Sequence, residues 1–278
     1  MQLMKEKNRT IGFLIDLDGT LYRGREPIPH AAEFIRFLQD AALPYLLVTN
    51  NSSRSPEQVA EHLQELGIEV PAAAVYTSSQ AAAQYMQEQR QGNRVHMIGE
   101  AGLQNALEAA GFLLDAQTPD YVVQGIDRSF TYAKLTEAAR HLHKGAAYVL
   151  TNPDRLLPSD GGLMPGAGTL AAAITAATGV QPVIIGKPSP IIMAYAIERL
   201  GLPAADVWVI GDNAATDIRG GLEAGCRTAL VLTGVATSAN VQDQLAAAGV
   251  TPDLIAADLR ELLTRIMPRD EADSASRR

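Results

Sequence analysis

Residues 11–20 read IGFLIDLDGT. A short continuous apolar run such as 11–15 is typical of a strand buried on both faces of a parallel sheet. Asp16 and Asp18 follow it directly, and side chains two apart on an extended chain point the same way. Their carboxylates repel one another unless a cation lies between them, and divalent cations prefer oxygen ligands. The stretch therefore predicts a catalytic, metal-binding aspartate pair.

The same DLDGT string has a plainer interpretation. It is also compatible with an Asp-rich turn that caps a helix, or with part of a calcium loop. A calcium loop needs further acidic ligands at fixed spacing, and Leu21, Tyr22 and Arg23 do not supply them. The position directly after a buried strand favours the catalytic interpretation.

Further apolar runs alternate with amphipathic segments, which predicts repeated strand-helix units. The expected strands after 11–15 are 45–48, 183–185, 207–210 and 229–232. The expected crossover helices are 31–40, 56–66, 190–200 and 218–224. This pattern predicts an α/β fold with a doubly wound, Rossmann-like parallel sheet.

A second set of units occupies the middle of the chain. Strands are expected at 95–98, 121–125 and 148–150, and helices near 102–110, 132–143 and 168–178. These units either extend the first sheet or form a domain of their own. We predict an inserted α/β cap over 79–181, a core formed by 1–78 and 182–267, and a disordered tail over 268–278.

Polar clusters follow three more of the expected strands. Thr49 and Asn50 end one strand, Lys187 follows the run 183–185, and Asp212 with Asn213 follows 207–210. Open α/β sheets bind ligands at the carboxyl ends of their strands, so these clusters are expected to converge on Asp16. Plainer interpretations are helix capping by Ser53 or Ser55, a surface lysine, and Asp217 as an acid in the first turn of a helix.

Composition narrows the classes of function. The net charge of −8 gives no general attraction for nucleic acid, and the chain has no apolar run long enough for a bilayer span and no signal peptide pattern. The single cysteine, Cys226, suits a reducing cytoplasm. None of the five histidines has metal-ligand spacing tied to the motifs, so we expect them to be structural or solvated.

Four motifs together resemble those of the haloacid dehalogenase superfamily, closest to its NagD-like and p-nitrophenyl phosphatase branch. They are DLDGT at 16–20, TNN at 49–51, GKP at 186–188 and GDNAATD at 211–217. The resemblance implies a phosphatase with an α/β cap between the second and third motifs, where the inserted block lies. It spans most of the chain.

By this resemblance Asp16 is the nucleophile that forms an aspartyl phosphate, and Asp18 is the general acid and base. Thr49, Asn50, Lys187 and Asn213 hold the phosphoryl group. Mg²⁺ is bound by Asp16, the backbone carbonyl of Asp18, and Asp212, while Asp217 orients Lys187 or a metal-bound water from outside the ligand shell. The substrate is a small phosphate ester, such as p-nitrophenyl phosphate, phosphoglycolate, a sugar phosphate or a nucleotide.

In the resembling family a cap loop reaches the substrate, and here that loop is expected over 151–166. Asn152 and Asp154 are expected to hydrogen-bond a polar leaving group and Met164 to pack on an apolar part, although a surface loop rich in turn residues has the same composition. The resemblance also implies a homodimer formed through the cap.

Rival functions remain open from the sequence. A phosphotransferase or phosphomutase shares the four motifs, but usually carries its cap after the first one. A receiver-like signalling domain stores phosphate on an aspartate, but Asp18 would shorten the life of that phosphate. A dehalogenase lacks the acid at that position, and a dehydrogenase needs G-x-G-x-x-G where this chain has DLDGT.

Overall fold

The computed structural model describes residues 10–114, 117–159 and 162–267, so the tail expected at 268–278 lies outside the described residues. The chain divides into two compact units. The first comprises the described residues up to Val48, the segment Ala60–Val75 and the residues from Met193 on. The second comprises Thr49–Val59 and Tyr76–Ile192, and is thus inserted twice into the first.

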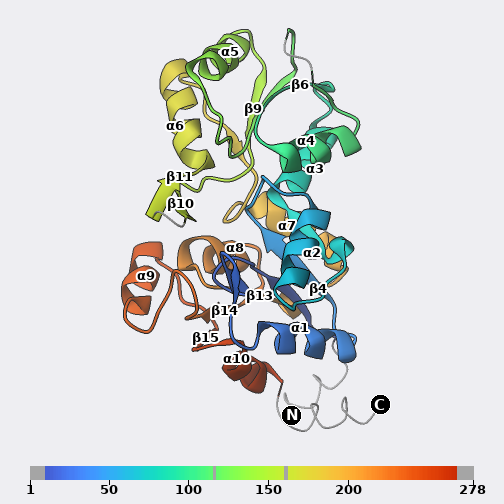
Figure 1. Cartoon of the computed structure of the whole chain (residues 1–278), viewed down its shortest axis with the longest axis vertical. Coiled ribbons are helices and arrows are strands. Elements are labelled where there is room, and N and C mark those ends of the chain that lie inside the picture. The colour runs from blue at the N-terminus through green and yellow to red at the C-terminus, as the bar shows by residue number, and fades with distance from the viewer. Residues whose placement is uncertain (1–9, 115–116, 160–161, 268–278) are drawn as a thin grey trace. The chain divides into compact units, whose positions relative to one another are not determined.

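The first unit is built on a six-stranded sheet with the order β15-β14-β13-β1-β4-β5 (Figure 1). The pairings from β15 through to β4 are parallel. With the strands renumbered along the chain, this order is 3-2-1-4-5-6 read from β5, which is the order of Rossmann folds. The strands are β1 Gly12–Ile15, β4 Tyr45–Thr49, β5 Val75–Thr77, β13 Val207–Gly211, β14 Arg227–Val231 and β15 Leu254–Ala256.

Helices connect these strands and bury their apolar sides. On α1, Phe34 packs edge-on against Phe13 of β1, with 6.3 Å between ring centroids. The helices are α1 Ala31–Asp40, α2 Pro56–Glu65, α7 Pro190–Leu200, α8 Arg219–Glu223, α9 Val241–Ala248 and α10 Leu259–Ile266. Short turns complete the set: 3-10 helices at Ala72–Ala74 and Ala204–Asp206, a π-helix η3 at Ala214–Ile218, and a hairpin of β2 Tyr22–Arg23 with β3 Glu26–Pro27.

The second unit has its own five-stranded parallel sheet, ordered β12-β9-β8-β6-β7. Renumbered along the chain, this is the flavodoxin-like order 2-1-3-4-5. Helices α5 and α6 cover one face and α3 and α4 the other (Figure 1). The strands are β6 Arg94–Ile98, β7 Leu113–Leu114, β8 Tyr121–Gln124, β9 Ala147–Leu150 and β12 Val183–Ile184. The helices are α3 Ser78–Gln89, α4 Ala101–Ala109, α5 Tyr132–His143 and α6 Ala167–Thr178.

An antiparallel hairpin follows β9 where the sequence suggested a loop. Its strands are β10 Leu156–Ser159 and β11 Gly162–Pro165. Leu156 and Leu163 expose 56% and 71% of their surface, so the hairpin presents apolar side chains outward.

The structure confirms the α/β class and the parallel-sheet core with an inserted α/β unit. One expected strand, however, was assigned to the wrong sheet. The run 183–185 was expected as a buried strand of the same sheet as Asp16. It is instead β12, an edge strand of the second sheet, with Val183 39% and Ile184 38% exposed. A short apolar run identifies a strand but not the sheet it joins, and here hydrogen bonding to β9 decides.

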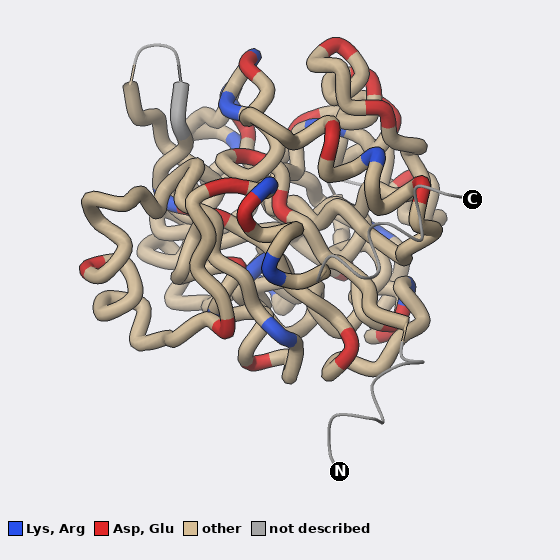
Figure 2. The backbone as a smooth tube through the Cα atoms, turned by 90° about the horizontal axis from the view of Figure 1, so that it is seen from below, with Lys and Arg blue, Asp and Glu red and all other residues tan. Residues whose placement is uncertain are grey.

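Charged residues of both signs are spread along the described part of the backbone. In the view of Figure 2, Lys and Arg positions are scattered among Asp and Glu positions and form no continuous stripe among the residues described. Within the same part of the chain, no helix is both long and apolar enough to cross a bilayer.

Candidate active site

Three carboxylates meet at the point where the strand order of the first sheet reverses. Asp16 follows β1 and Asp212 follows β13, and these two strands are paired in parallel. Asp217 lies in η3, just beyond β13. One carboxylate oxygen from each of the three lies within 4.8 Å of the others. A switch point between adjacent parallel strands is the usual ligand position in such sheets, so the fold itself gathers this cluster.

The backbone after β13 is shaped to bring Asp217 back toward the strand. The π-helix η3 is closed by hydrogen bonds from Asp217 N and Ile218 N to Asn213 O, at 3.0 and 3.4 Å. Asn213 N donates to Asp217 Oδ2 at 3.1 Å, and the Asn213 side chain accepts from Ala215 N at 2.9 Å. Single π turns of this kind are frequent at functional sites because they redirect a side chain.

Asp212 sits in a tight cradle of backbone. Its Oδ2 accepts from Val235 N at 2.5 Å, and its carbonyl accepts from Ala236 N at 2.9 Å. A β-carbon at Gly19 would lie 2.2 Å from the Oδ2 of Asp212, and one at Gly234 would lie 1.8 Å from it. Two glycines from separate loops therefore make room for this carboxylate.

The cluster fits a divalent cation. Three acidic side chains whose oxygens lie within 4.8 Å of one another are strongly repulsive unless a positive charge offsets them. All the donors are oxygens, which is the set that hard cations such as Mg²⁺ take. Asp212 and Asp217 are buried and each has one oxygen fixed by a backbone N–H, so the cluster is already organised.

Asp18 is not among the three carboxylates of that cluster. Its side chain is exposed, and its Oδ2 accepts a hydrogen bond of 3.2 Å from the hydroxyl of Tyr22. Gly19 follows Asp18 with a φ of +86°, and Gly19 N donates to Tyr22 O at 2.7 Å. This turn brings the Tyr22 hydroxyl back to the Asp18 carboxylate.

The TNN loop belongs to the second unit. Thr49 ends β4 and is buried, and its Oγ1 accepts from Asn51 N at 3.0 Å. Asn50 Nδ2 donates to Lys187 O at 3.0 Å and to Asp154 Oδ2 at 3.1 Å. Lys187 is only 4% exposed. Asn50 and Lys187, two of the expected phosphate-binding residues, are thus hydrogen-bonded to one another, and Thr49 lies in the same unit.

Asn152 lies beside them and is also buried. Its Nδ2 donates to Asn50 O at 2.9 Å and to Thr151 Oγ1 at 3.2 Å, and its Oδ1 accepts from Asp154 N at 3.2 Å. Both ends of this amide are therefore engaged by the chain itself. Met164 is half-buried on β11, opposite Leu157.

The remainder of the TNN loop closes the switch point of the second sheet, between β6 and β8. Ser52 Oγ accepts from Ile126 N at 3.1 Å, and Ser53 O accepts from Gly102 N at 3.0 Å. A β-carbon at Gly102 would lie 2.5 Å from the backbone nitrogen of Arg54. The position that commonly holds a ligand in flavodoxin-like sheets is here filled by this chain's own backbone.

Sequence reasoning missed several residues of the site. Gly234 and Val235 follow β14, in a loop with no acidic or basic signal, and they matter through backbone position alone. Tyr22 stands four residues after Asp18, and no pattern indicated that its hydroxyl returns to that carboxylate. Only the T-G-V string at 233–235, close to the end of an expected strand, offered a weak signal for a tight turn.

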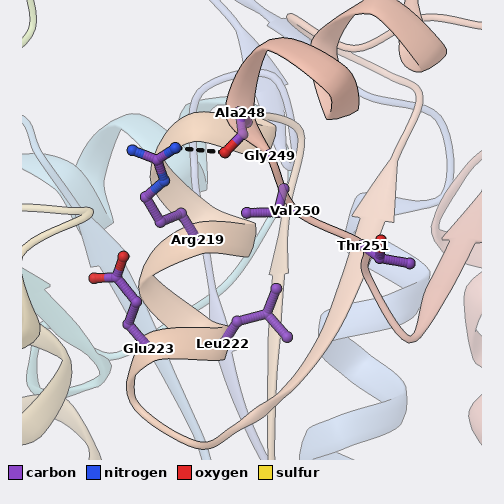
Figure 3. A pocket seen from close by; sticks show the side chains of 7 residues that line it. All are labelled: Arg219, Leu222, Glu223, Ala248, Gly249, Val250 and Thr251. Carbon is purple, nitrogen blue, oxygen red and sulfur yellow. Dashed lines mark hydrogen bonds between the residues drawn. The ribbon is translucent and has the colours of Figure 1, made fainter.

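A shallow pocket of about 440 Å³ lies elsewhere on the first unit, between α8 and the end of α9 (Figure 3). Arg219 points across it and donates to the carbonyl of Ala248, near the last turn of α9. This is a helix C-terminal capping contact. The pocket is lined by Arg219, Leu222, Glu223, Ala248, Gly249, Val250 and Thr251.

Two family descriptions match the chain. Residues 13–113 match the haloacid dehalogenase-like hydrolases, and residues 184–262 match the HAD-hydrolase-like family. These ranges contain all four motifs on which the expected site was based.

Curated relatives and solved structures agree with this assignment. The chain is 45% identical over 234 residues to the 5'-nucleotidase YutF of Bacillus subtilis, covering 84% of this chain and 91% of YutF. It is 42% identical to the acid sugar phosphatase of Staphylococcus saprophyticus, covering 91% of this chain and 97% of that one.

Among solved structures, a p-nitrophenyl phosphatase from Archaeoglobus fulgidus superposes with a TM-score of 0.88 at 34% identity, over 92% of this chain and 99% of that one. NagD from E. coli superposes with a TM-score of 0.84 at 32% identity, over 91% and 98%. The chain therefore belongs to the haloacid dehalogenase-like hydrolases, in the NagD-like branch, and is a phosphoric monoester hydrolase.

Proposed function

We propose that the protein hydrolyses small phosphate monoesters with Mg²⁺ through an aspartyl phosphate on Asp16. The observation that carries this proposal is the grouping of Asp16, Asp212 and Asp217, with one oxygen of each within 4.8 Å of the others. A nucleophilic carboxylate beside a cation site suits attack on phosphorus, because bound Mg²⁺ offsets charge that spreads over the phosphoryl oxygens.

The roles of the other residues follow from their chemistry. Thr49, Asn50 and Lys187 would bind the phosphoryl oxygens, and the hydrogen bond from Asn50 Nδ2 to Lys187 O supports a joint role for two of them. Asn213 contributes backbone and side-chain hydrogen bonds that hold the π turn around Asp217. Asp18 would serve as general acid and then general base.

The carboxylates would divide the metal-binding work. Asp16 and Asp212 would hold Mg²⁺ together with the backbone carbonyl of Asp18. Asp217 would act beside them, and its inclusion in the oxygen cluster supports a direct influence on the metal. Residues 79–181 would form the cap that selects the substrate, with Asp154 and Met164 near the leaving group.

The substrate class rests on the relatives. YutF is named a 5'-nucleotidase, the staphylococcal relative an acid sugar phosphatase and the archaeal relative a p-nitrophenyl phosphatase. We propose that this enzyme accepts a range of small phosphate esters. Measuring kcat/KM for nucleotides, sugar phosphates, phosphoglycolate and pyridoxal phosphate would rank these substrates.

The decisive experiment uses p-nitrophenyl phosphate with Mg²⁺, with and without a chelator, for the native chain and for Asp16→Asn. Turnover should require both the metal and Asp16. Rapid acid quenching followed by mass spectrometry should find a base-labile phosphate on the native chain and none on the variant. Turnover by the variant at the native rate would remove Asp16 from the mechanism.

We also propose a homodimer formed through the second unit, in the cytoplasm. The exposed Leu156 and Leu163 on the β10–β11 hairpin support a contact with a second copy, because contiguous exposed apolar side chains often mark an interface. The single, buried Cys226 suits a reducing compartment. Sedimentation of the native chain and of Leu163→Lys tests the dimer.

A further inference from the structure

The side chain of Asp18 is tethered by a buried tyrosine. Tyr22 is 4% exposed, whereas Asp18 is exposed, and the Tyr22 hydroxyl donates to Asp18 Oδ2 at 3.2 Å. A hydrogen bond restricts an exposed carboxylate only if its donor is itself fixed. The contacts that hold the ring of Tyr22 therefore contribute to how firmly Asp18 is placed.

The backbone of Tyr22 is fixed by the turn that begins at Leu17. Leu17 O accepts from Leu21 N at 2.8 Å and from Tyr22 N at 3.3 Å. Tyr22 then pairs with Pro27 in the β2–β3 hairpin. The ring therefore projects from a closed turn and not from a loose loop.

The ring of Tyr22 is fixed by His62 of α2. The two rings meet edge to face, with centroids 5.0 Å apart and planes at 87°. Nε2 of His62 lies 3.0 Å from Gly24 O, and since a carbonyl only accepts, Nε2 carries the proton. His62 is thus anchored to the β2–β3 hairpin that carries Tyr22. Edge-to-face pairs of this kind add about 0.5–1.5 kcal/mol beyond burial.

We infer that Tyr22, supported by His62, is a positioning residue that holds the Asp18 carboxyl for proton transfer to the leaving oxygen. This inference rests on the proposed function. It goes beyond it by assigning a role to two residues outside the four motifs, from their contacts alone.

The proton of Asp18 is consumed in the first chemical step and restored in the second. Asp16 Oδ forms a bond to phosphorus while the bond from phosphorus to the ester oxygen breaks, and the proton of the Asp18 carboxyl passes to that oxygen. The products are an alcohol, an aspartyl phosphate and an Asp18 carboxylate. Water then attacks phosphorus, its proton returns to Asp18, and inorganic phosphate leaves with the Asp16 carboxylate restored.

The need for a positioned acid depends on the leaving group. A p-nitrophenolate leaves readily without a proton, whereas an alkoxide needs one as the bond breaks. General acid catalysis contributes about 10²–10⁴-fold where it is needed. Loss of orientation at Asp18 should therefore penalise alkyl esters and spare p-nitrophenyl phosphate.

The experiment compares Tyr22→Phe with the native chain on substituted phenyl phosphates and benzyl phosphate. The measured quantity is kcat/KM, which reports the steps up to formation of the aspartyl phosphate. We expect kcat/KM to fall about tenfold or more for benzyl phosphate and to stay within about twofold for p-nitrophenyl phosphate. An equal fall for every ester would overturn the inference, because a general structural defect has no reason to follow leaving-group basicity.

Two further variants sharpen the result. Tyr148→Phe is the matched control, since it also removes a buried tyrosine hydroxyl, one that donates to Gln124 Oε1 at 3.0 Å in the second unit. It should show no dependence on the leaving group. In an Asp18→Asn background, Tyr22→Phe should lose its selective effect, and persistence of that effect would contradict action through Asp18.

The inference and the proposed function fail separately. Turnover by Asp16→Asn at the native rate would refute the proposed function. An inactive Asp16→Asn together with a uniform effect of Tyr22→Phe would refute the role of Tyr22 alone. His62→Ala removes the ring that Tyr22 packs on, and it should lower kcat/KM for benzyl phosphate selectively, but less than Tyr22→Phe does. If His62→Ala shows no such selective fall, His62 does not help to position Tyr22.

Discussion

Gly19 lies so close to Asp212 that a β-carbon on residue 19 would stand 2.2 Å from Asp212 Oδ2. Gly19 also has a φ of +86°, a conformation that other residues adopt only at a cost. Two separate constraints, backbone conformation and space for the Asp212 carboxylate, therefore meet at the fourth residue of DLDGT.

Gly19→Ala should separate these constraints when compared with Gly67→Ala. Gly67 has a φ of +76° and nothing within 4 Å of the place that a methyl group would take, so its substitution carries only the backbone cost. We expect Gly19→Ala to lower kcat about a hundredfold or more, since small displacements of catalytic groups have effects of that size. Gly67→Ala should keep its activity. Equal activity of the two variants would contradict crowding at Asp212.

Asp217→Asn should weaken the affinity for Mg²⁺ without unfolding the chain. One oxygen of Asp217 belongs to the cluster with Asp16 and Asp212, so losing its charge should raise the Mg²⁺ concentration for half-activation about 10- to 100-fold. Titration of activity with Mg²⁺ measures this. Asp243→Asn, an exposed acid in the first turn of α9, is the control and should leave the midpoint unchanged.

Asn152→Ala should disturb the TNN loop without changing the affinity for Mg²⁺. The variant loses the hydrogen bonds to Asn50 O and Thr151 Oγ1 and the acceptor for Asp154 N, at a cost of about 1–3 kcal/mol if these groups stay buried and unpaired. We expect a lower kcat/KM with the Mg²⁺ midpoint preserved. Asn105→Ala on the exposed side of α4 should change neither quantity, and a shifted Mg²⁺ midpoint in Asn152→Ala would refute the separation.

His96 should make the second unit sensitive to acid. Burial, together with the neighbouring His141, lowers the pKa of His96 from its usual 6.5, and Glu137 opposes this shift. The unfolded chain therefore takes up the proton first as the pH falls below about 6.5, and stability declines until the pH reaches the folded pKa, by at most about 1.4 kcal/mol per pH unit.

Urea unfolding followed by circular dichroism between about pH 5 and 7 measures this slope. His96→Leu should flatten it, while His143→Gln, at an exposed position on α5, should not. An NMR titration in which His96 gains its proton above 6.5 would contradict the expected direction.

Arg219→Met should destabilise the first unit by about 1 kcal/mol, because it removes the donor that caps the carbonyl of Ala248. Trp208, buried on β13 of the same unit, reports the unfolding by fluorescence. Glu223→Gln changes another residue of the same pocket and should shift the urea midpoint little. Similar losses in both variants would argue against the capping role.

The closeness of Asp16 and Asp212 could be predicted from the sequence, because it depends on where two strands end. Asp16 and Asp212 each follow an apolar run, and parallel pairing of β1 with β13 brings them together. The sheet that carries Lys187 could not be predicted. The strand before Lys187 was assigned to the wrong sheet, because two exposed apolar residues do not indicate which strand they pair with.

Contacts that run between distant loops could not be read from periodicity. Asn152 is expected to contact substrate, and a polar residue after a strand gives no sign that its amide also forms hydrogen bonds within the chain. His62 reaches Tyr22 from a helix forty residues later, and neither residue type is diagnostic. The backbone N–H of Val235 leaves no trace in residue chemistry.

The hydrogen bonds that tie Asn50 to Asp154, Asn152 and Lys187 have a consequence for engineering new specificities. A chimera made by exchanging residues 79–181 for those of a relative would sever partners of Asn50 and leave its loop facing foreign neighbours. The exchangeable module is larger, and a transplant should carry 49–59 and 182–192 along with it.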